Sequence, residues 1–536
     1  MIDIDPIHAA QTYEFAGQDV PSLLRQRAAN QAERPALIWE PKSGIEAVWT
    51  YRQLDEESDE IAAGLCARGV QKGDRVLIHA DNCPETILVF YACAKIGAVS
   101  VVTNTRCVAA DIRYFAEHTN AVLAITQPKY APLVLSNAQT CRSVFVTSTD
   151  SGVTPELDRI PDACESFEAL YGDASMAPAR DPEPMLPVGI MYTSGTTSRP
   201  KAVVHTHANA LWAGRMSTAS MDYRSSDKFL AFLPLFHVNA MGWGVWGSLG
   251  VGAALVLQPK FSSSRFWEVI QKHQVTHCSV VSFVFKAIAA YPVPEQHSLR
   301  VLAMGVIVPE IGEWLKVRPY ACWGMTEMVS NATRSCEFQE YPRNSIGKPV
   351  PGYNLAIVNP ETGELCGEGE TGELWVHGTR GVTIFLEYFD NEEANEKAFT
   401  KNGWFKTGDW VRLGPEGNFF FCDRDKDVLK VGGENVSALE VENCVREVPG
   451  VSDVAVVAKH HSMLDMVSVA FIEASVDSEA QQEELKSRIL EHCKEKLADF
   501  KAPRAVYLID ALPRGTMDKV TKTELRQMAE SMPSID

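Results

Sequence analysis

The alternation of helix-like and strand-like segments is the feature that most constrains the fold of this chain. Apolar residues recur at helical spacing from Tyr51 to Arg68 and again from Pro84 to Ile96. Short β-branched runs lie between and after these segments, at residues 74–79, 99–102, 121–126 and 143–147. Strands that alternate with helices in this way predict parallel sheets covered by helices. We therefore expect an α/β fold over roughly the first 420 residues.

The character of the sequence changes after Gly417. Phe419-Phe420-Phe421 has the composition of a strand, and a dense run of charges follows at residues 423–427. Beyond this run the sequence predicts two strands, at 454–458 and 466–472, and an acid- and base-rich helix at 479–496. We expect a large N-terminal domain of residues 1–425 and a small, mobile α+β C-terminal domain of residues 426–536.

Length and charge limit the classes of function. A chain of 536 residues is too long for one ordinary core, and its net charge of −19 disfavours nucleic acid and anionic membranes as partners. The longest apolar stretch, Thr86 to Val102, is interrupted by Lys95, so we expect a buried helix and strand there and no membrane span. The 13 cysteines contain no C-x-x-C pair, and the N-terminus lacks a signal-peptide pattern, which indicates a cytoplasmic protein with reduced thiols.

Hydroxyl groups, one glycine and one lysine are concentrated in the stretch Thr193-Ser194-Gly195-Thr196-Thr197-Ser198-Arg199-Pro200-Lys201, directly after an apolar run. Such a loop offers N–H groups, O–H groups and one cation, which are the donors that a polyphosphate needs. The stretch is not a Walker A motif, because Pro200 precedes Lys201 and Ala202 follows it. Taken alone, the stretch is more typical of a solvated surface loop than of a phosphate-binding loop.

Three further motifs favour the phosphate-binding interpretation of this stretch over the surface-loop interpretation. They are Trp323-Gly324-Met325-Thr326-Glu327, Trp404-Phe405-Lys406-Thr407-Gly408-Asp409 and Leu512-Pro513-Arg514-Gly515-Thr516-Met517-Asp518-Lys519. With Tyr192–Val203 they resemble, in order and spacing, the motifs of the adenylate-forming superfamily, which includes acyl-CoA synthetases, peptide-synthetase adenylation domains and luciferases. Within this superfamily, residues 266–268, 383–389 and 432–437 are most similar to carnitine/crotonobetaine-type CoA ligases.

The resemblance implies roles for the nucleotide-binding residues. Thr193, Ser194, Gly195, Thr196, Thr197 and Lys201 would hold the phosphates of ATP. Trp323 and Gly324 would hold the adenine, Thr326 the α-phosphate, and Glu327 the Mg²⁺ ion, which prefers carboxylate oxygens. Asp409 and Arg424 would bind the ribose.

The resemblance also implies a catalytic set of Lys519, Thr196, Glu327 and His237. Lys519 would stabilise charge at the reacting phosphorus, although Asp518 stands beside it where glycine is usual. His237 closes the stretch Phe232–His237 that resembles the wall of the acyl pocket, and we expect it to position the substrate without proton transfer. Lys426 would act as the hinge, with Gly432 and Gly433 at the coenzyme A tunnel.

We therefore expect an AMP-forming carboxylic acid:CoA ligase that uses ATP, Mg²⁺ and coenzyme A. Its partner would be a small-molecule carboxylic acid, and the apolar residues around 232–246 favour an aliphatic, aromatic or polycyclic one. The resemblance also allows a homodimer. Two alternatives stay open: a free-standing enzyme that loads a carrier protein, and a nucleotide-binding regulator that no longer catalyses. The regulator is suggested by the departures from the family pattern at Ser198, Ala202, Asp518 and Lys522.

Overall fold

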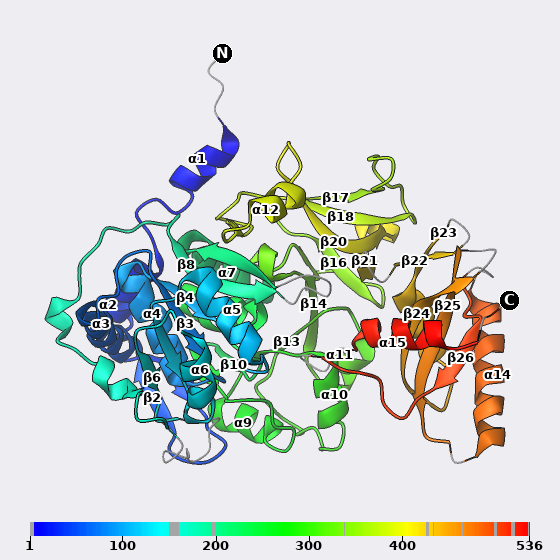
Figure 1. The fold of residues 1–536 in the computed structure, drawn as a ribbon, viewed down its shortest axis with the longest axis horizontal. Helices are drawn as coiled ribbons and strands as arrows, with labels where there is room; N and C mark the ends of the chain where they lie inside the picture. Colours follow the sequence, from blue (N-terminus) through cyan, green and yellow to red (C-terminus); the bar gives the residue numbers. More distant parts are fainter. Residues whose placement is uncertain are drawn as a thin grey trace. The chain divides into compact units, whose positions relative to one another are not determined.

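The computed structural model describes residues 5–149, 160–193, 200–336, 338–424, 428–431, 434–461, 465–476, 478–497, 501–515, 520–533 and 535. The chain divides into two compact units. Unit 1 comprises residues 1–354 and 377–405, and unit 2 comprises residues 355–376 and 406–536 (Figure 1). The predicted domain boundary at residues 425 and 426 lies outside the described residues and stays a prediction.

The first sheet of unit 1 has eight strands in the order β19-β9-β8-β4-β3-β5-β6-β7. Its strands are β3 (Arg75–His79), β4 (Val99–Val102), β5 (Leu123–Thr126), β6 (Val144–Val146), β7 (Glu165–Ser166), β8 (Pro187–Thr193), β9 (Lys201–Thr206) and β19 (Glu387–Tyr388). The six strands from β8 to β7 are parallel, as the sequence predicts. β9 and β19 add an antiparallel edge, because β8 and β9 form a hairpin and β19 pairs antiparallel with β9.

Alternating residues of this sheet face two different helical layers. Val76 and Ile78 of β3 join the core that contains Ile87 of α4 (Pro84–Ile96), whereas Leu77 joins the core that contains Phe115 of α5 (Ala109–Thr119). This period of two is the geometry of a strand covered on both faces. The predicted stretch Thr86 to Val102 forms α4 and β4, and among the described residues no helix combines the length and apolarity that a membrane crossing requires.

The second sheet of unit 1 has the strand order β16-β15-β14-β13-β12-β10-β11-β1-β2. Its six strands from β14 to β1 are parallel, whereas β15, β16 and β2 pair antiparallel with their neighbours. Its strands are β1 (Pro35–Trp39), β2 (Ala47–Thr50), β10 (Lys228–Ala231), β11 (Ala254–Leu257), β12 (His277–Ser279), β13 (Val301–Met304), β14 (Arg318–Trp323), β15 (Thr333–Arg334) and β16 (Ser345–Pro349).

The described residues of unit 1 also form twelve α-helices and several short helices. The α-helices are α1 (Pro6–Tyr13), α2 (Val20–Asn30), α3 (Tyr51–Ala67), α4 (Pro84–Ile96), α5 (Ala109–Thr119), α6 (Ala131–Asn137), α7 (His207–Met221), α8 (Gly247–Val251), α9 (Phe266–His273), α10 (Ser282–Ile288), α11 (Pro309–Leu315) and α12 (Glu392–Ala398). The short helices are the 3₁₀-helices η1 (Pro128–Tyr130), η3 (Phe167–Leu170), η4 (Ala174–Met176) and η6 (Thr326–Met328), and the π-helix η5 (Asn239–Trp246).

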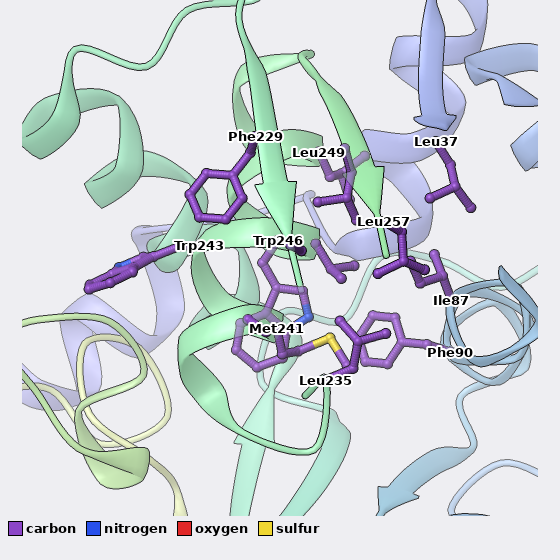
Figure 2. Packing of buried hydrophobic residues seen from close by; sticks show 14 of the residues in the cluster. Leu37, Ile87, Phe90, Phe229, Leu235, Met241, Trp243, Trp246, Leu249 and Leu257 are labelled. Atoms are coloured by element: carbon purple, nitrogen blue, oxygen red, sulfur yellow. The ribbon is translucent and has the colours of Figure 1, made fainter. Parts of the chain in front are cut away.

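The π-helix η5 lies in the main core of unit 1. Figure 2 shows its Met241 and Trp246 among Phe90 of α4, Phe229 of β10 and Leu257 of β11. This one core therefore takes residues from both sheets and from the helices next to them. The indole of Trp246 is fully buried, so η5 is anchored by a large apolar side chain.

Unit 2 is built from two groups of strands. The first comprises β17 (Asn354–Val358), β18 (Thr371–His377), β20 (Trp404–Leu413) and β21 (Phe419–Arg424), with the 3₁₀-helix η7 (Pro415–Gly417). The second comprises β22 (Val428–Val431), β23 (Glu434–Ser437), β24 (Val451–His461), β25 (Asp465–Ala474) and β26 (Ala505–Leu508), with α13 (Ala438–Arg446), α14 (Glu479–Lys496) and α15 (Lys522–Ser531). In the second group, Val456 of β24 packs with Leu485 of α14 and Val457 with Leu525 of α15, which confirms the predicted small α+β segment.

Candidate active site

The hydroxyl-rich loop leaves and re-enters the first sheet through the hairpin β8–β9. Thr193 and Lys201 form its last cross-strand pair, and Thr193 Oγ1 donates to the Lys201 carbonyl oxygen at 3.4 Å. Residues 194–199, which include the predicted Ser194, Gly195, Thr196 and Thr197, lie outside the described residues. Lys201 Nζ lies 4.7 Å from the ring centroid of Tyr388, so the cation at the loop exit is held over an aromatic face.

Tyr388 also contacts the predicted metal ligand. Its hydroxyl donates to Glu327 Oε1 at 2.8 Å, and the Glu327 side chain is buried, with the residue only 3% exposed. Burial and the neighbouring carboxylate raise the pKa of Tyr388, so its phenol stays protonated and remains a donor. The pairing of β19 with β9 explains this placement, because it sets Tyr388 opposite Val203. One tyrosine thus connects Lys201 with Glu327.

His205 holds the backbone next to Glu327. Its Nε2 donates to the carbonyl oxygen of Thr326 at 2.8 Å. Burial lowers the pKa of His205 to about 4, so the ring is neutral near pH 7 and carries its proton on Nε2. Thr326 and Glu327 are therefore tied to β9 through a histidine and a tyrosine.

The predicted adenine segment makes a tight turn. Trp323 ends β14, is buried, and donates its backbone N–H to Thr333 Oγ1 at 3.1 Å. A Cβ at Gly324 would lie 2.2 Å from the Ser330 carbonyl oxygen, so only glycine fits there. Val329 has φ 64°, and Ser330 N donates to the Met328 carbonyl oxygen at 2.5 Å across it. This is a γ-turn with positive φ, a strained conformation that surrounding contacts must hold.

The π-helix η5 supplies part of that support. Gly242 packs so closely that a Cβ there would lie 2.9 Å from the Val329 carbonyl oxygen, and Trp243 Nε1 donates to Ser330 Oγ at 3.2 Å. The Trp246 and His205 rings meet edge to face at 5.5 Å. π-Helices are rare in proteins, and those that do occur frequently lie at functional sites. Here η5 packs against the turn that follows Glu327.

His237 lies just before η5. Its carbonyl oxygen accepts from Met241 N at 3.2 Å, and its ring lies 4.7 Å from that of Phe236. Burial lowers the pKa of His237 to about 4, with Arg106 as a smaller cause, so the imidazole is neutral near pH 7. A neutral ring suits the positioning role that we predicted for it.

The predicted ribose ligands lie in unit 2. Asp409 pairs with Arg424 across β20 and β21 and is 4% exposed. The backbone N–H of Asp409 donates to Thr407 Oγ1 at 3.0 Å. The backbone N–H of Gly408 donates to Glu373 Oε1 at 3.0 Å. The predicted Lys426, Gly432, Gly433 and Lys519 lie outside the described residues.

The donor set around Glu327 fits Mg²⁺. This ion takes oxygen ligands, and proteins usually give it one or two carboxylates while substrate phosphates and water complete the shell. Glu327 offers one buried carboxylate, and the phenol of Tyr388, which donates a hydrogen bond to it, is uncharged and does not compete with a cation. Sequence reasoning missed Tyr388 and His205. Tyr388 falls in the stretch 383–389 that resembles the ligases, but nothing in that stretch indicates which side chain reaches Glu327.

Comparisons with known proteins show which family this chain belongs to. Residues 24–389 match the family described as AMP-binding enzyme, and residues 440–519 match the AMP-binding enzyme C-terminal domain. The chain is 32% identical over 526 residues to a crotonobetaine/carnitine–CoA ligase of Proteus mirabilis, a match that covers 94% of this chain and 98% of that protein. It is 30% identical over 524 residues to the enzyme of the same name from Citrobacter koseri, with 95% and 99% covered.

Solved structures show the same likeness. The o-succinylbenzoate coenzyme A synthetase of Bacillus subtilis, solved with ATP and magnesium ion, superposes with a TM-score of 0.80 at 27% identity, over 95% of this chain and 98% of that one. An anthranilate CoA ligase solved with anthranoyl-AMP gives a TM-score of 0.83 at 25% identity, over 96% and 97%. The predicted fold class and the predicted likeness to carnitine/crotonobetaine-type ligases are confirmed. By its sequence and its fold, this chain belongs to the AMP-binding enzyme family.

Proposed function

We propose that this protein is an AMP-forming carboxylic acid:CoA ligase. The observation that carries the proposal is the chain of contacts from Lys201 through Tyr388 to Glu327, which lies beside the hydroxyl-rich loop in a member of the AMP-binding enzyme family. This chain of contacts links a carboxylate to Lys201, the cation that ends the hydroxyl-rich stretch. Phosphoryl and nucleotidyl transfer depend mainly on such positioning and on electrostatic stabilisation.

In the first half-reaction, a carboxylate oxygen of the substrate attacks the α-phosphorus of ATP. A new O–P bond forms, the bond to the β-phosphate oxygen breaks, and pyrophosphate leaves. Residues 193–197 and Lys201 hold the phosphates, Trp323 and Gly324 contact the adenine, and Lys519 stabilises the charge that develops at phosphorus. Mg²⁺ held by Glu327 would neutralise part of the phosphate charge.

In the second half-reaction, the thiol of coenzyme A attacks the carbonyl carbon of the acyl-adenylate, loses its proton, and displaces AMP. We propose that the C-terminal domain, residues 426–536, turns about Lys426 between the two steps. This motion would withdraw Lys519 and present Gly432 and Gly433 to the thiol. Asp409 and Arg424 hold the ribose throughout.

The same reasoning extends to partners and cellular setting. The substrate is a small-molecule carboxylic acid, and the buried aromatic π-helix η5 favours an aliphatic, aromatic or polycyclic one. The curated relatives are named for crotonobetaine and carnitine, whose ammonium group would require an aromatic cage or a carboxylate. The net charge of −19 argues against nucleic acid, and 13 free cysteines support a cytoplasmic location. A homodimer is compatible with this proposal.

Pyrophosphate release tests the proposal. The purified protein is given Mg²⁺-ATP with each member of a panel that contains carnitine, crotonobetaine, hexanoate, benzoate and cholate. We expect pyrophosphate release that depends on one or more acids, and a thioester product once coenzyme A is added. A thioester formed on a holo-carrier protein but not on coenzyme A would favour the carrier-loading alternative. ATP binding without acid-dependent pyrophosphate release would favour the regulator.

A further inference from the structure

Helix α5, which lies outside all the recognised motifs, contacts both ends of the hydroxyl-rich loop. Before the loop, His118 Nδ1 lies 2.9 Å from Tyr192 Oη, a hydrogen bond one residue ahead of Thr193. After the loop, Tyr114 Oη donates to the Pro200 carbonyl oxygen at 3.2 Å. Tyr114 and His118 are four residues apart and therefore share one face of the helix. One face of α5 therefore makes hydrogen bonds on both sides of residues 194–199, to Tyr192 before them and to Pro200 after them.

Ring packing fixes the direction of these contacts. The Tyr114 and His118 rings are stacked, with centroids 5.1 Å apart and planes 11° apart. The Tyr192 ring packs on Phe115, with centroids 4.1 Å apart, in the cluster that joins α5 to β8 and β9. Each ring therefore has little freedom to turn its polar atom away from the hairpin.

The same face also reaches the segment that carries Tyr388. The His118 ring meets that of Phe389 edge to face at 5.8 Å, and Phe389 N donates to the Ala202 carbonyl oxygen at 2.8 Å. Glu117 is exposed and lines a cavity of about 1060 Å³ that His118 and Phe389 also line. Successive helical residues project about 100° apart, so Glu117 offers a control position one residue from His118 on a different side of α5.

We propose that Tyr114 and His118 are positioning residues that set the two ends of the phosphate-binding loop. This inference rests on the proposed function, because it takes the loop to bind the triphosphate of ATP. Holding both ends of a short loop removes conformations that ATP binding would otherwise have to order. Loss of one anchor should therefore weaken ATP binding, by about threefold to tenfold for one neutral hydrogen bond.

The dissociation constant of Mg²⁺-ATP, measured by titration calorimetry, tests this role without requiring turnover. Tyr114→Phe removes the oxygen that bonds to Pro200 and keeps the stacked ring. Tyr192→Phe and His118→Phe each remove the other bond, so each should weaken ATP binding by about threefold to tenfold. The double variant His118→Phe with Tyr192→Phe should bind ATP as tightly as whichever of the two single variants has the lower affinity for ATP. Both substitutions delete the same hydrogen bond, so their effects should not add. Glu117→Gln should bind ATP like the wild type.

A second measurement separates positioning from general destabilisation. Thioester formation from a supplied acyl-adenylate and coenzyme A should be unchanged in Tyr114→Phe, because this step does not use the triphosphate. Equal losses in both half-reactions, or wild-type ATP affinity in Tyr114→Phe and Tyr192→Phe, would overturn the inference. Failure of the proposed function looks different, because the wild type itself would then show no acid-dependent pyrophosphate release.

Discussion

At the scale of single residues, the account depends most on Glu327. Glu327→Gln keeps the size of the side chain and removes its charge. If the carboxylate holds Mg²⁺ at the reacting phosphates, acid-dependent pyrophosphate release should fall about 100-fold or more, the usual scale for one electrostatic group at a transition state. Initial rates at saturating ATP measure this effect. A fall of less than about threefold would contradict the role given to Glu327.

Tyr388 provides the companion test, because it acts through Glu327. Tyr388→Phe keeps the ring over which Lys201 lies and removes the hydroxyl that donates to Glu327. Loss of a partner that orients a metal ligand typically weakens metal affinity by 10- to 100-fold. The variant should therefore need about 10- to 100-fold more Mg²⁺ for half-maximal rate, with a smaller change at saturating Mg²⁺. An unchanged Mg²⁺ requirement would mean that the hydrogen bond does not orient the carboxylate.

At the scale of elements, the π-helix η5 and the γ-turn at Val329 act together. Gly242→Ala would place a Cβ 2.9 Å from the Val329 carbonyl oxygen, closer than real Cβ contacts allow. The turn after Glu327 must then shift, so we expect a loss of about 1–3 kcal/mol in the free energy of unfolding together with slower adenylation. Chemical denaturation and pyrophosphate release measure the two effects.

Gly244 is the matched control for this experiment. It lies in the same π-helix, and a Cβ there would meet Leu255 at 3.4 Å, an ordinary van der Waals distance. Gly244→Ala should therefore leave adenylation close to wild type. Equal effects of the two alanine substitutions would show that the π-helix matters through its own backbone and not through the turn.

At the scale of the whole molecule, buried histidines make stability depend on pH. Burial lowers the pKa values of His79, His205 and His237 from 6.5 to about 4. Between these values the unfolded chain binds protons that the folded chain does not, so the free energy of unfolding decreases as pH falls from about 6.5 to about 4. Melting temperatures measured across pH 4 to 8 should fall steeply below pH 6.5. A flat profile in that window would contradict the burial of these rings.

A substitution sharpens the same measurement. His79→Asn removes one buried imidazole and should make the pH profile shallower, whatever its effect on absolute stability. The slope of melting temperature against pH is the quantity to compare, because it reports proton uptake and not packing.

The two half-reactions are also tested at the scale of the whole molecule, because we propose that each requires a different position of the C-terminal domain. Lys519→Ala should lower adenylation by about 100-fold or more. It should leave thioester formation from a supplied acyl-adenylate nearly unchanged, because we propose that Lys519 is withdrawn before that step. Equal losses in both half-reactions would contradict this assignment.

Local signals explain which parts of the molecule the sequence could predict. The helix predicted at Tyr51–Arg68 is α3, Tyr51–Ala67, because Thr50 caps it and its apolar residues keep one face. The motifs also predict a phosphate-binding loop and a metal-binding carboxylate, and both stay predictions. The contact of Tyr388 with Glu327 could not be predicted from the sequence, because the two residues are 61 positions apart and β19 is only two residues long. The strain at Val329 was also hidden, since a β-branched residue is the least expected at positive φ.

The central claim is that a carboxyl oxygen of the substrate becomes bonded to the α-phosphorus of ATP. The most direct test uses the acid that is active in the panel, labelled with ¹⁸O at both carboxyl oxygens, with ATP, Mg²⁺ and coenzyme A. Mass spectrometry of the products should find one ¹⁸O in AMP, one in the acyl-CoA carbonyl, and none in pyrophosphate. Unlabelled AMP, or label in inorganic phosphate with formation of ADP, would contradict the account.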